Sequence, residues 1–197
     1  MGRADTTTGP SKRERLHARL ERARDEQLFV RIRRRPSDVD AVGGFVVGIG
    51  SRWVAVVRLS ESLELNGWSI LRVDDIRSVR IEPDHEAFEI KALQARGQWP
   101  PPAAGVRLDD DVEALRDAAA RAPLVTVLRE RDKPDVCWIG VVREIRASTL
   151  SLLNVDNRAA WDRRPTTYDL DDITRVDWGG GYEHALHLVA GPAPADA

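Results

Sequence analysis

Few side chains in this sequence have the types and spacing that chemistry requires. His184 and His187 stand three residues apart, so one helix face could bring both to a metal ion, but no carboxylate or cysteine supplies a recognisable third ligand. Ser51, Ser148 and Ser151 lack a nucleophile elbow, and the glycine runs lack the sequence of a phosphate loop. We therefore expect a protein that is not an enzyme and has no metal and no cofactor.

The chain has one cysteine, Cys137. It can form no intramolecular disulfide, and nothing in the sequence demands an oxidising compartment. Because it stands between Val136 and Trp138 in an apolar stretch, we predict a buried structural thiol.

A tryptophan surrounded by arginines is the first candidate for a binding contact. The segment NRAAWDRRP holds Arg158, Trp161, Arg163 and Arg164, and exposed tryptophan beside arginine is typical of contact hot spots. Trp161 could stack on a nucleobase. The alternative is a loop tryptophan folded over the mouth of a β-barrel.

The second candidate is a basic cluster, Arg31, Arg33, Arg34 and Arg35. It ends a 35-residue segment in which 11 basic side chains stand against 5 acidic ones. Such a cluster could contact phosphate backbones. The alternative is a solvated helix face followed by a basic strand end. Overall the charge is close to balance, at −2.

These candidates must be positioned by short elements, mostly strands. An amphipathic helix is predicted from Ser11, a plausible N-cap. Alternating or apolar runs then predict strands at residues 28–34, 41–49, 52–59, 68–73 and 76–81, and a short helix at 87–95.

The second part of the chain repeats this order. A helix is predicted at residues 109–121, ended by Pro123. Strands are predicted at residues 124–129, 136–145, 149–155, 166–170 and 173–178. Residues 182–189 have the spacing of a short closing helix, with a strand as the alternative.

The two parts also match residue by residue, at an offset of about 96. The matched positions are Gly44, Ile49, Val54, Val56 and Leu59 with Gly140, Ile145, Leu150, Leu152 and Val155, and then Val73 to Ile76 with Leu170 to Ile173. Two diverged copies of one small β module would produce this pattern.

A helix followed by five short, bent antiparallel strands resembles the order of Sm-like barrels. The stretch from Ile139 to Val142 with its central Gly140, followed by 149–152, is similar to the first Sm motif, as is the stretch from Gly44 to Val56. A glycine is needed where a strand shared by both faces of a small barrel bends sharply. An SH3-like barrel is the alternative, since it shows the same five strands without the leading helix.

The second Sm motif is not matched. Its usual Arg or Lys followed by Gly is replaced by Asp74-Asp75 and by Asp171-Asp172. The resemblance therefore implies a fold, while RNA binding at that turn is not expected.

We accordingly predict a mainly β protein of two tandem small five-stranded antiparallel barrels, Sm-like or SH3-like, each preceded by an α-helix. The predicted organisation is a disordered tail at 1–10, a first module at 11–95, a Pro-rich linker at 96–105, a second module at 106–190 and a tail at 191–197.

This organisation favours a non-enzymatic protein-interaction or assembly module that pairs its edge strands with one another, with a second copy or with a partner strand. The alternative is an RNA-binding or other nucleic-acid-binding protein that uses the basic N-terminal region and the Trp161 loop. No apolar run approaches the roughly 18 residues of a membrane span, and no secretory signal is evident, so we expect a cytoplasmic protein without membrane contact.

Overall fold

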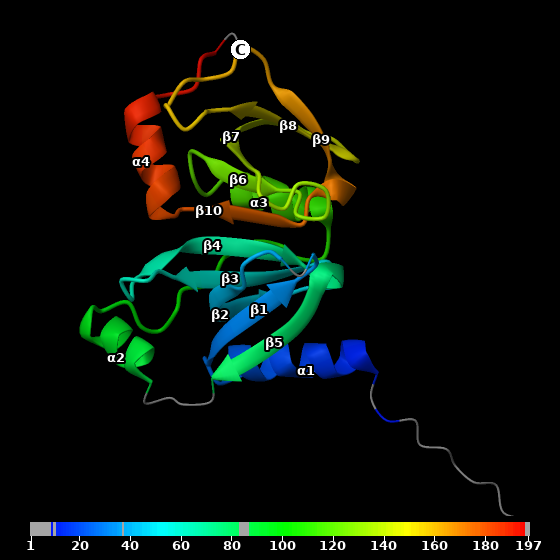
Figure 1. Ribbon diagram of the computed structural model, residues 1–197, viewed down its shortest axis with the longest axis vertical. Helices are drawn as coiled ribbons and strands as arrows, with labels where there is room; N and C mark the ends of the chain where they lie inside the picture. Colours follow the sequence, from blue (N-terminus) through cyan, green and yellow to red (C-terminus); the bar gives the residue numbers. More distant parts are fainter. Residues whose placement is uncertain (1–8, 10, 37, 83–86, 196–197) are drawn as a thin grey trace, which may run out of the picture.

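Ten antiparallel strands form one open sheet through the part of the chain that the structure describes (Figure 1). This computed structural model describes residues 9, 11–36, 38–82 and 87–195. The strand order is β5-β1-β2-β3-β4-β10-β6-β7-β8-β9. The protein is thus mainly β, as predicted.

The first half of the molecule runs from α1 to α2. Its elements are α1 (Lys12–Asp25), β1 (Phe29–Arg34), β2 (Val42–Ile49), β3 (Trp53–Leu59), β4 (Leu65–Arg72), the 3₁₀ turn η1 (Val73–Asp75), β5 (Ile76–Glu82) and α2 (Phe88–Ala95). Helix α1 begins at a capping box, in which Ser11 and Glu14 satisfy each other's backbone N–H groups. It buries Leu20 and Ala23 and lies across the end of this half that is far from the sheet centre (Figure 1).

The second half runs from α3 to α4. Its elements are α3 (Asp111–Ala119), β6 (Val125–Leu128), β7 (Cys137–Ile145), β8 (Thr149–Asn154), β9 (Thr166–Asp169), the 3₁₀ turn η2 (Leu170–Asp172), β10 (Arg175–Trp178) and α4 (Gly181–Ala190). Helix α3 is capped by Asp110, whose side chain accepts from the Glu113 N–H. The closing element predicted at residues 182–189 is helix α4 and not a strand.

Both halves have the same strand order and share one irregularity. The order β5-β1-β2-β3-β4 recurs as β10-β6-β7-β8-β9. The β2–β3 pairing shifts register between Val46 and Gly48, and the β7–β8 pairing shifts at the corresponding Val142 and Glu144. A bulge of this kind bends a strand, so the bend is part of the repeated pattern.

The matched glycines have a steric reason to be glycine. A Cβ atom on Gly44 would lie 2.0 Å from the Val57 carbonyl oxygen, and one on Gly140 would lie 2.1 Å from the Leu153 carbonyl oxygen. No side chain fits at either distance. The close approach of two backbones at the strand bend therefore requires glycine in both halves, as the sequence indicated.

The prediction of two separate closed five-stranded barrels is wrong. Strands β4 and β10, at the ends of the two five-strand sets, pair with each other and join the halves into one sheet. The largest apolar core crosses this pairing, since Trp53 and Ile70 of the first half pack with Val176 and Trp178 of the second. A repeated pattern shows which strands form, but it does not show which neighbour an end strand takes.

The structure describes the predicted linker segment but little of the predicted tails. The predicted tail at 1–10 lies outside the described residues except for Gly9, as do residues 196–197. Within segment 96–105, Ala104 is buried, and the Pro102 carbonyl accepts a hydrogen bond from Trp68 Nε1 at 3.3 Å. Among the described helices, none is long and apolar enough to cross a membrane.

Candidate functional site

The two halves meet along strands β4 and β10. Ile70 faces Val176, Ser69 faces Asp177 and Trp68 faces Trp178 in this antiparallel pairing. The two tryptophan rings stack, with centroids 6.2 Å apart and planes 12° apart. Strand pairing and aromatic packing therefore act together at the junction.

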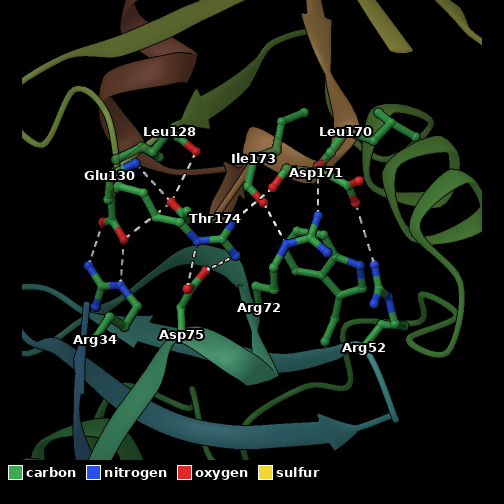
Figure 2. A network of polar contacts seen from close by, with 12 residues as sticks. Arg34, Arg52, Arg72, Asp75, Leu128, Glu130, Leu170, Asp171, Ile173 and Thr174 are labelled. Atoms are coloured by element: carbon green, nitrogen blue, oxygen red, sulfur yellow. Dashed lines mark hydrogen bonds and ion pairs between the residues drawn. The ribbon is translucent and has the colours of Figure 1, made fainter. Parts of the chain in front are cut away.

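A buried ion pair crosses the junction beside these strands (Figure 2). Arg34 Nη2 lies 2.6 Å from Glu130 Oε1, and Arg34 Nε donates to Glu130 Oε2 at 2.9 Å. The two side chains are only 1% and 2% exposed. A bidentate pair at this depth is strongly held, because removing either partner leaves an uncompensated buried charge.

Glu130 is positioned by Thr174. The Glu130 backbone N–H donates to Thr174 Oγ1 at 3.0 Å, and the Thr174 N–H donates to the Leu128 carbonyl at 2.9 Å. These contacts hold the segment after β6 against the start of β10 (Figure 2). The carboxylate that Arg34 meets is therefore fixed by the second half alone.

Arg72, at the end of β4, reaches across to the turn before β10. Its Nε donates to the Ile173 carbonyl at 2.8 Å and its Nη2 to the Leu170 carbonyl at 2.6 Å. Its guanidinium lies 4.5 Å from the centre of the Trp53 ring. One arginine thus binds the backbone carbonyls of Leu170 and Ile173 and packs on a core aromatic ring.

Asp111, at the start of α3, receives the remaining donors from this region. Arg52 Nη2 donates to it at 2.5 Å, Arg72 Nη1 at 3.3 Å and Trp53 Nε1 at 2.8 Å. Burial by itself would raise the pKa of Asp111, but the Arg52 hydrogen bond and the charges of Arg72 and Arg52 hold it below its ordinary value.

The acidic turns use their second aspartate to hold arginine. Arg131 Nε and Nη2 each lie 2.8 Å from an oxygen of Asp75 in η1, and Arg131 Nη1 donates to the Asp171 carbonyl at 2.8 Å. The hydrogen bond with Asp75 raises the pKa of Arg131. In η2, Asp172 accepts from Arg129 of its own half at 2.8 Å. The second aspartate of each turn, Asp75 or Asp172, thus holds an arginine of the protein itself.

We use the name junction network for the side chains that carry or support these contacts between the two halves: Arg34, Arg52, Arg72, Asp75, Asp111, Glu130, Arg131 and Thr174. Their donors and acceptors meet one another or backbone carbonyls. An arrangement in which the charges neutralise each other is suited to holding two bodies together. It offers no general base or nucleophile with a free reacting atom.

The basic cluster predicted from the sequence is divided by the strand. Arg31, Arg33 and Arg35 are exposed, and the Arg31 guanidinium lies 5.4 Å from the centre of the Phe29 ring. Arg34 points to the opposite side of the strand, where it forms the buried ion pair with Glu130. Alternation along β1 explains the division, since successive side chains face opposite sides.

The Trp161 loop is held close to the body. Trp161 is half-buried, packs near Leu124, Val155 and Leu186, and donates from Nε1 to the Ala190 carbonyl at 3.3 Å. The arginines around it, Arg158, Arg163 and Arg164, are exposed. The loop lies far from the basic cluster in the strand order, so the structure does not bring the two candidate surfaces together.

Searches against protein-family models, curated proteins and solved structures found no match to this chain. The resemblance to Sm-like proteins therefore stays a prediction.

The other groups considered in the sequence are the lone cysteine and the two histidines of α4. Cys137 is exposed rather than buried, so the prediction of a buried thiol is wrong: its position begins β7, where the side chain faces a cavity. His184 is exposed and His187 is half-buried on α4. Among the described residues no group of three or more His, Cys, Asp or Glu side chains could hold a metal ion.

The two outer strands of the sheet form a second candidate region. β5 pairs with β1 on one side, β9 pairs with β8 on one side, and neither has a second strand neighbour among the described residues. A groove of about 620 Å³ runs between α1 and β5, lined by Ala18, Arg19, Arg22 and the residues from Ser78 to Ile81. Sequence reasoning missed the groove because α1 and β5 are far apart in the chain.

Proposed function

We propose that this protein is a non-enzymatic assembly module that joins chains through the free edges of its sheet. Each edge pairs with another copy of the chain, so that β9 of one copy lies beside β5 of the next. Edge strands carry unpaired N–H and C=O groups and readily accept another strand.

One observation carries the proposal: the halves are already joined by an edge-strand pairing. β4 and β10 are the end strands of two sets with the same order. β9 corresponds to β4, and β5 corresponds to β10. The two free edges are thus the same two kinds of strand that pair within the chain, and repeating that pairing would bring β9 onto β5 of another copy.

The pairing also suggests a register. Leu71 faces Arg175 at the junction, and the corresponding residues are Tyr168 in β9 and Ser78 in β5. The next positions along would then place Asp169 beside Arg77. Both side chains are exposed, and opposite charges placed across an antiparallel pair stabilise it by roughly 0.2–1 kcal/mol.

The wider charge distribution supports the same orientation. Residues 1–106 carry 18 basic and 15 acidic side chains, and residues 107–197 carry 12 and 17. Arg77 and Arg80 project from β5, while Asp169 ends β9 and Asp171 follows it. A basic edge and an acidic edge favour contact between copies in a head-to-tail sense, which closes into a ring or continues as a filament.

The first experiment is light scattering of the full chain in low and high salt. We expect a mass of two or more times 22.0 kDa, such as about 66 kDa for a closed ring of three chains, and only a modest loss of assembly with salt because backbone hydrogen bonds dominate. A mass of one chain at both salt concentrations would overturn self-assembly.

A charge-reversal pair identifies the strands. Arg77→Glu and Asp169→Arg should each weaken assembly about fivefold. The double variant should recover assembly, because it restores an opposite-charge pair at every β9–β5 contact. The matched control is Lys133→Glu, an exposed loop position with the same charge change. If the control weakens assembly as much as Arg77→Glu, the β9–β5 register is wrong.

A further inference from the structure

Helices α2 and α4 hold equivalent places in the two halves. Each follows the last strand of its half in chain order, and each packs on or beside the first three strands of that half, in a cluster that contains Ile90 of α2 or Leu186 of α4. Each ends beside a glycine of positive φ, Gly97 at +69° and Gly191 at +70°, and prolines follow both glycines. We call residues 191–197 the tail. The tail thus corresponds to the linker that follows α2.

Within the chain, the linker crosses from the first half to the second. Trp68 Nε1 of β4 donates to the Pro102 carbonyl at 3.3 Å, and Ala104 is buried in the core that both halves share. The backbone N–H of Arg107 then donates to Asp117 of α3 at 2.9 Å, and the Arg107 side chain donates to it at 2.8 Å. The linker therefore covers the seam between α3 and the strands of the junction.

The equivalent seam in the first half is open. Helix α1 corresponds to α3, since Leu20 and Ala23 are buried in α1 at the spacing of Leu115 and Ala118 in α3. Strand β5 corresponds to β10. The groove of about 620 Å³ between α1 and β5 therefore lies in the first half where the linker passes in the second. A seam that is covered at the junction is left uncovered at the free edge.

The tail begins along the path that the linker takes. Trp99 of the linker packs on Phe45 of β2, with ring centroids 5.4 Å apart. The Pro194 carbonyl of the tail accepts a hydrogen bond from Arg143 of β7, and β2 and β7 are equivalent strands. Residue 197 stands as many positions beyond its glycine as Ala103 does in the linker. Since Ala103 lines the space beside α3, the tail is long enough to reach the same place on a neighbouring copy.

Charge favours the tail as the occupant of the groove. The charged side chains that line the groove are all arginines: Arg19, Arg22 and Arg80. Two of them also contact glutamates that lie outside the lining. The tail carries one charged side chain, Asp196. Its prolines restrict the chain before docking, so that less conformational entropy is lost on binding.

We propose that the tail of one copy docks into the groove between α1 and β5 of the next copy. It covers between chains the seam that the linker covers within the chain. This inference rests on the proposed function, because it needs β9 of one copy to lie beside β5 of the next. Asp196 then lies among the arginines of the groove, and the small side chains of the tail pack on Ala18, Val79 and Ile81 of its lining.

Disulfide trapping tests this contact directly. In a full chain with Cys137→Ser, the test variant carries Ala197→Cys and Ala18→Cys, and the control carries Ala197→Cys and His17→Cys. Ala18 lines the groove, whereas His17 faces the β2–β3 turn on another side of α1. Under mild oxidation we expect linked copies to form about tenfold faster in the test variant, because docking raises the effective concentration of the two thiols. Non-reducing gels measure the rate, and equal rates in the two variants would overturn tail docking.

Removal of residues 192–197 separates this inference from the proposed function. In light scattering over a concentration series, we expect the shortened chain to assemble about tenfold more weakly, since β9 still pairs with β5 but the groove stays open. Asp196→Lys should weaken assembly about two- to fivefold, and the matched control Asp38→Lys, at an exposed loop position, should not. If the full and the shortened chain assemble equally well, the tail inference is wrong and the proposed function stands. A full chain that has the mass of one copy at every concentration would overturn both.

Discussion

Strands β5 and β10 hold equivalent places in the two halves, but only β10 is paired on both sides. The positions that match Arg80 and Ile81 in β5 are Asp177 and Trp178 in β10. Arg80 is exposed, whereas Asp177 and Trp178 are buried. The same backbone position thus carries a solvated charge where the edge is free, and a group that needs a partner where the edge is covered.

The acidic turns differ in the same way. In η1 the buried Asp75 takes its arginine from the other half, and in η2 Asp172 takes Arg129 from its own half. Both turns lie at the junction, since Arg72 of the first half also binds the Leu170 carbonyl of η2. They differ in that the buried aspartate of η1 is held by an arginine of the other half, whereas Asp172 is held within its own half. Divergence between the copies therefore reports which surfaces are in contact, while the strand order itself is unchanged.

The largest effect should come from breaking the buried pair of the junction network. Arg34→Met removes the bidentate partner of the buried Glu130 and leaves Arg175 Nη1, 4.0 Å from Oε1, as its only charged partner among the described residues, so we expect a loss of about 3–5 kcal/mol of unfolding free energy. The measurement is chemical denaturation. Arg33→Met, at the exposed neighbouring position, is the control and should cost less than about 0.5 kcal/mol.

The double variant Arg34→Met, Glu130→Met sharpens this result. Replacing both charges by apolar side chains of similar size should recover most of the loss, since no charge then remains uncompensated. If Arg34→Met costs no more than Arg33→Met, the junction does not depend on this ion pair.

A somewhat smaller effect tests whether the halves really share their strand bend. Gly44→Ala and Gly140→Ala should each cost about 1–3 kcal/mol, by equal amounts, because each new Cβ meets a backbone carbonyl oxygen at nearly the same distance. Thermal unfolding measures both. Gly181→Ala serves as the control, as its nearest neighbour would be Asn66 Oδ1 at 3.6 Å. Unequal costs would mean that the two bends are not under the same constraint.

The third effect concerns pH. The folded-state pKa of Asp111 is lowered, so its contribution to stability is fully present above its unfolded value of 3.8 and is lost as pH falls through the lower folded value. We expect Asp111→Asn to cost about 1–2 kcal/mol at pH 7 and the difference from wild type to shrink below pH 3.8.

The matched control for this titration is Asp171→Asn. Asp171 is 94% exposed, so its replacement should leave the acid unfolding curve nearly unchanged. A difference between wild type and Asp111→Asn that stays constant from pH 7 to acid would show that the charge of Asp111 contributes nothing.

The sequence was sufficient for the elements and for the duplication, because hydrophobic alternation, glycine at the bends and helix caps are local signals. It did not predict that β4 and β10 pair, since backbone pairing between end strands depends on contacts more than a hundred residues apart. Arg34 was grouped with its exposed neighbours although strand alternation places it on the opposite face. Its partner, Glu130, lies 96 residues away, and no local sequence pattern indicates this ion pair.

The smallest effect should come from the exposed arginines of β1. If the free edges serve assembly, replacing Arg33 and Arg35 by Ser should change stability by no more than about 0.5 kcal/mol and should leave the native mass unchanged. An RNA mobility shift, measured in low and high salt, tests the alternative function with the same variant. A shift in the wild type that falls steeply with salt and disappears in the variant would favour nucleic-acid binding, because phosphate contacts dominate such affinity. Arg34 is left intact in this variant, so a lost shift could not be attributed to opening of the junction.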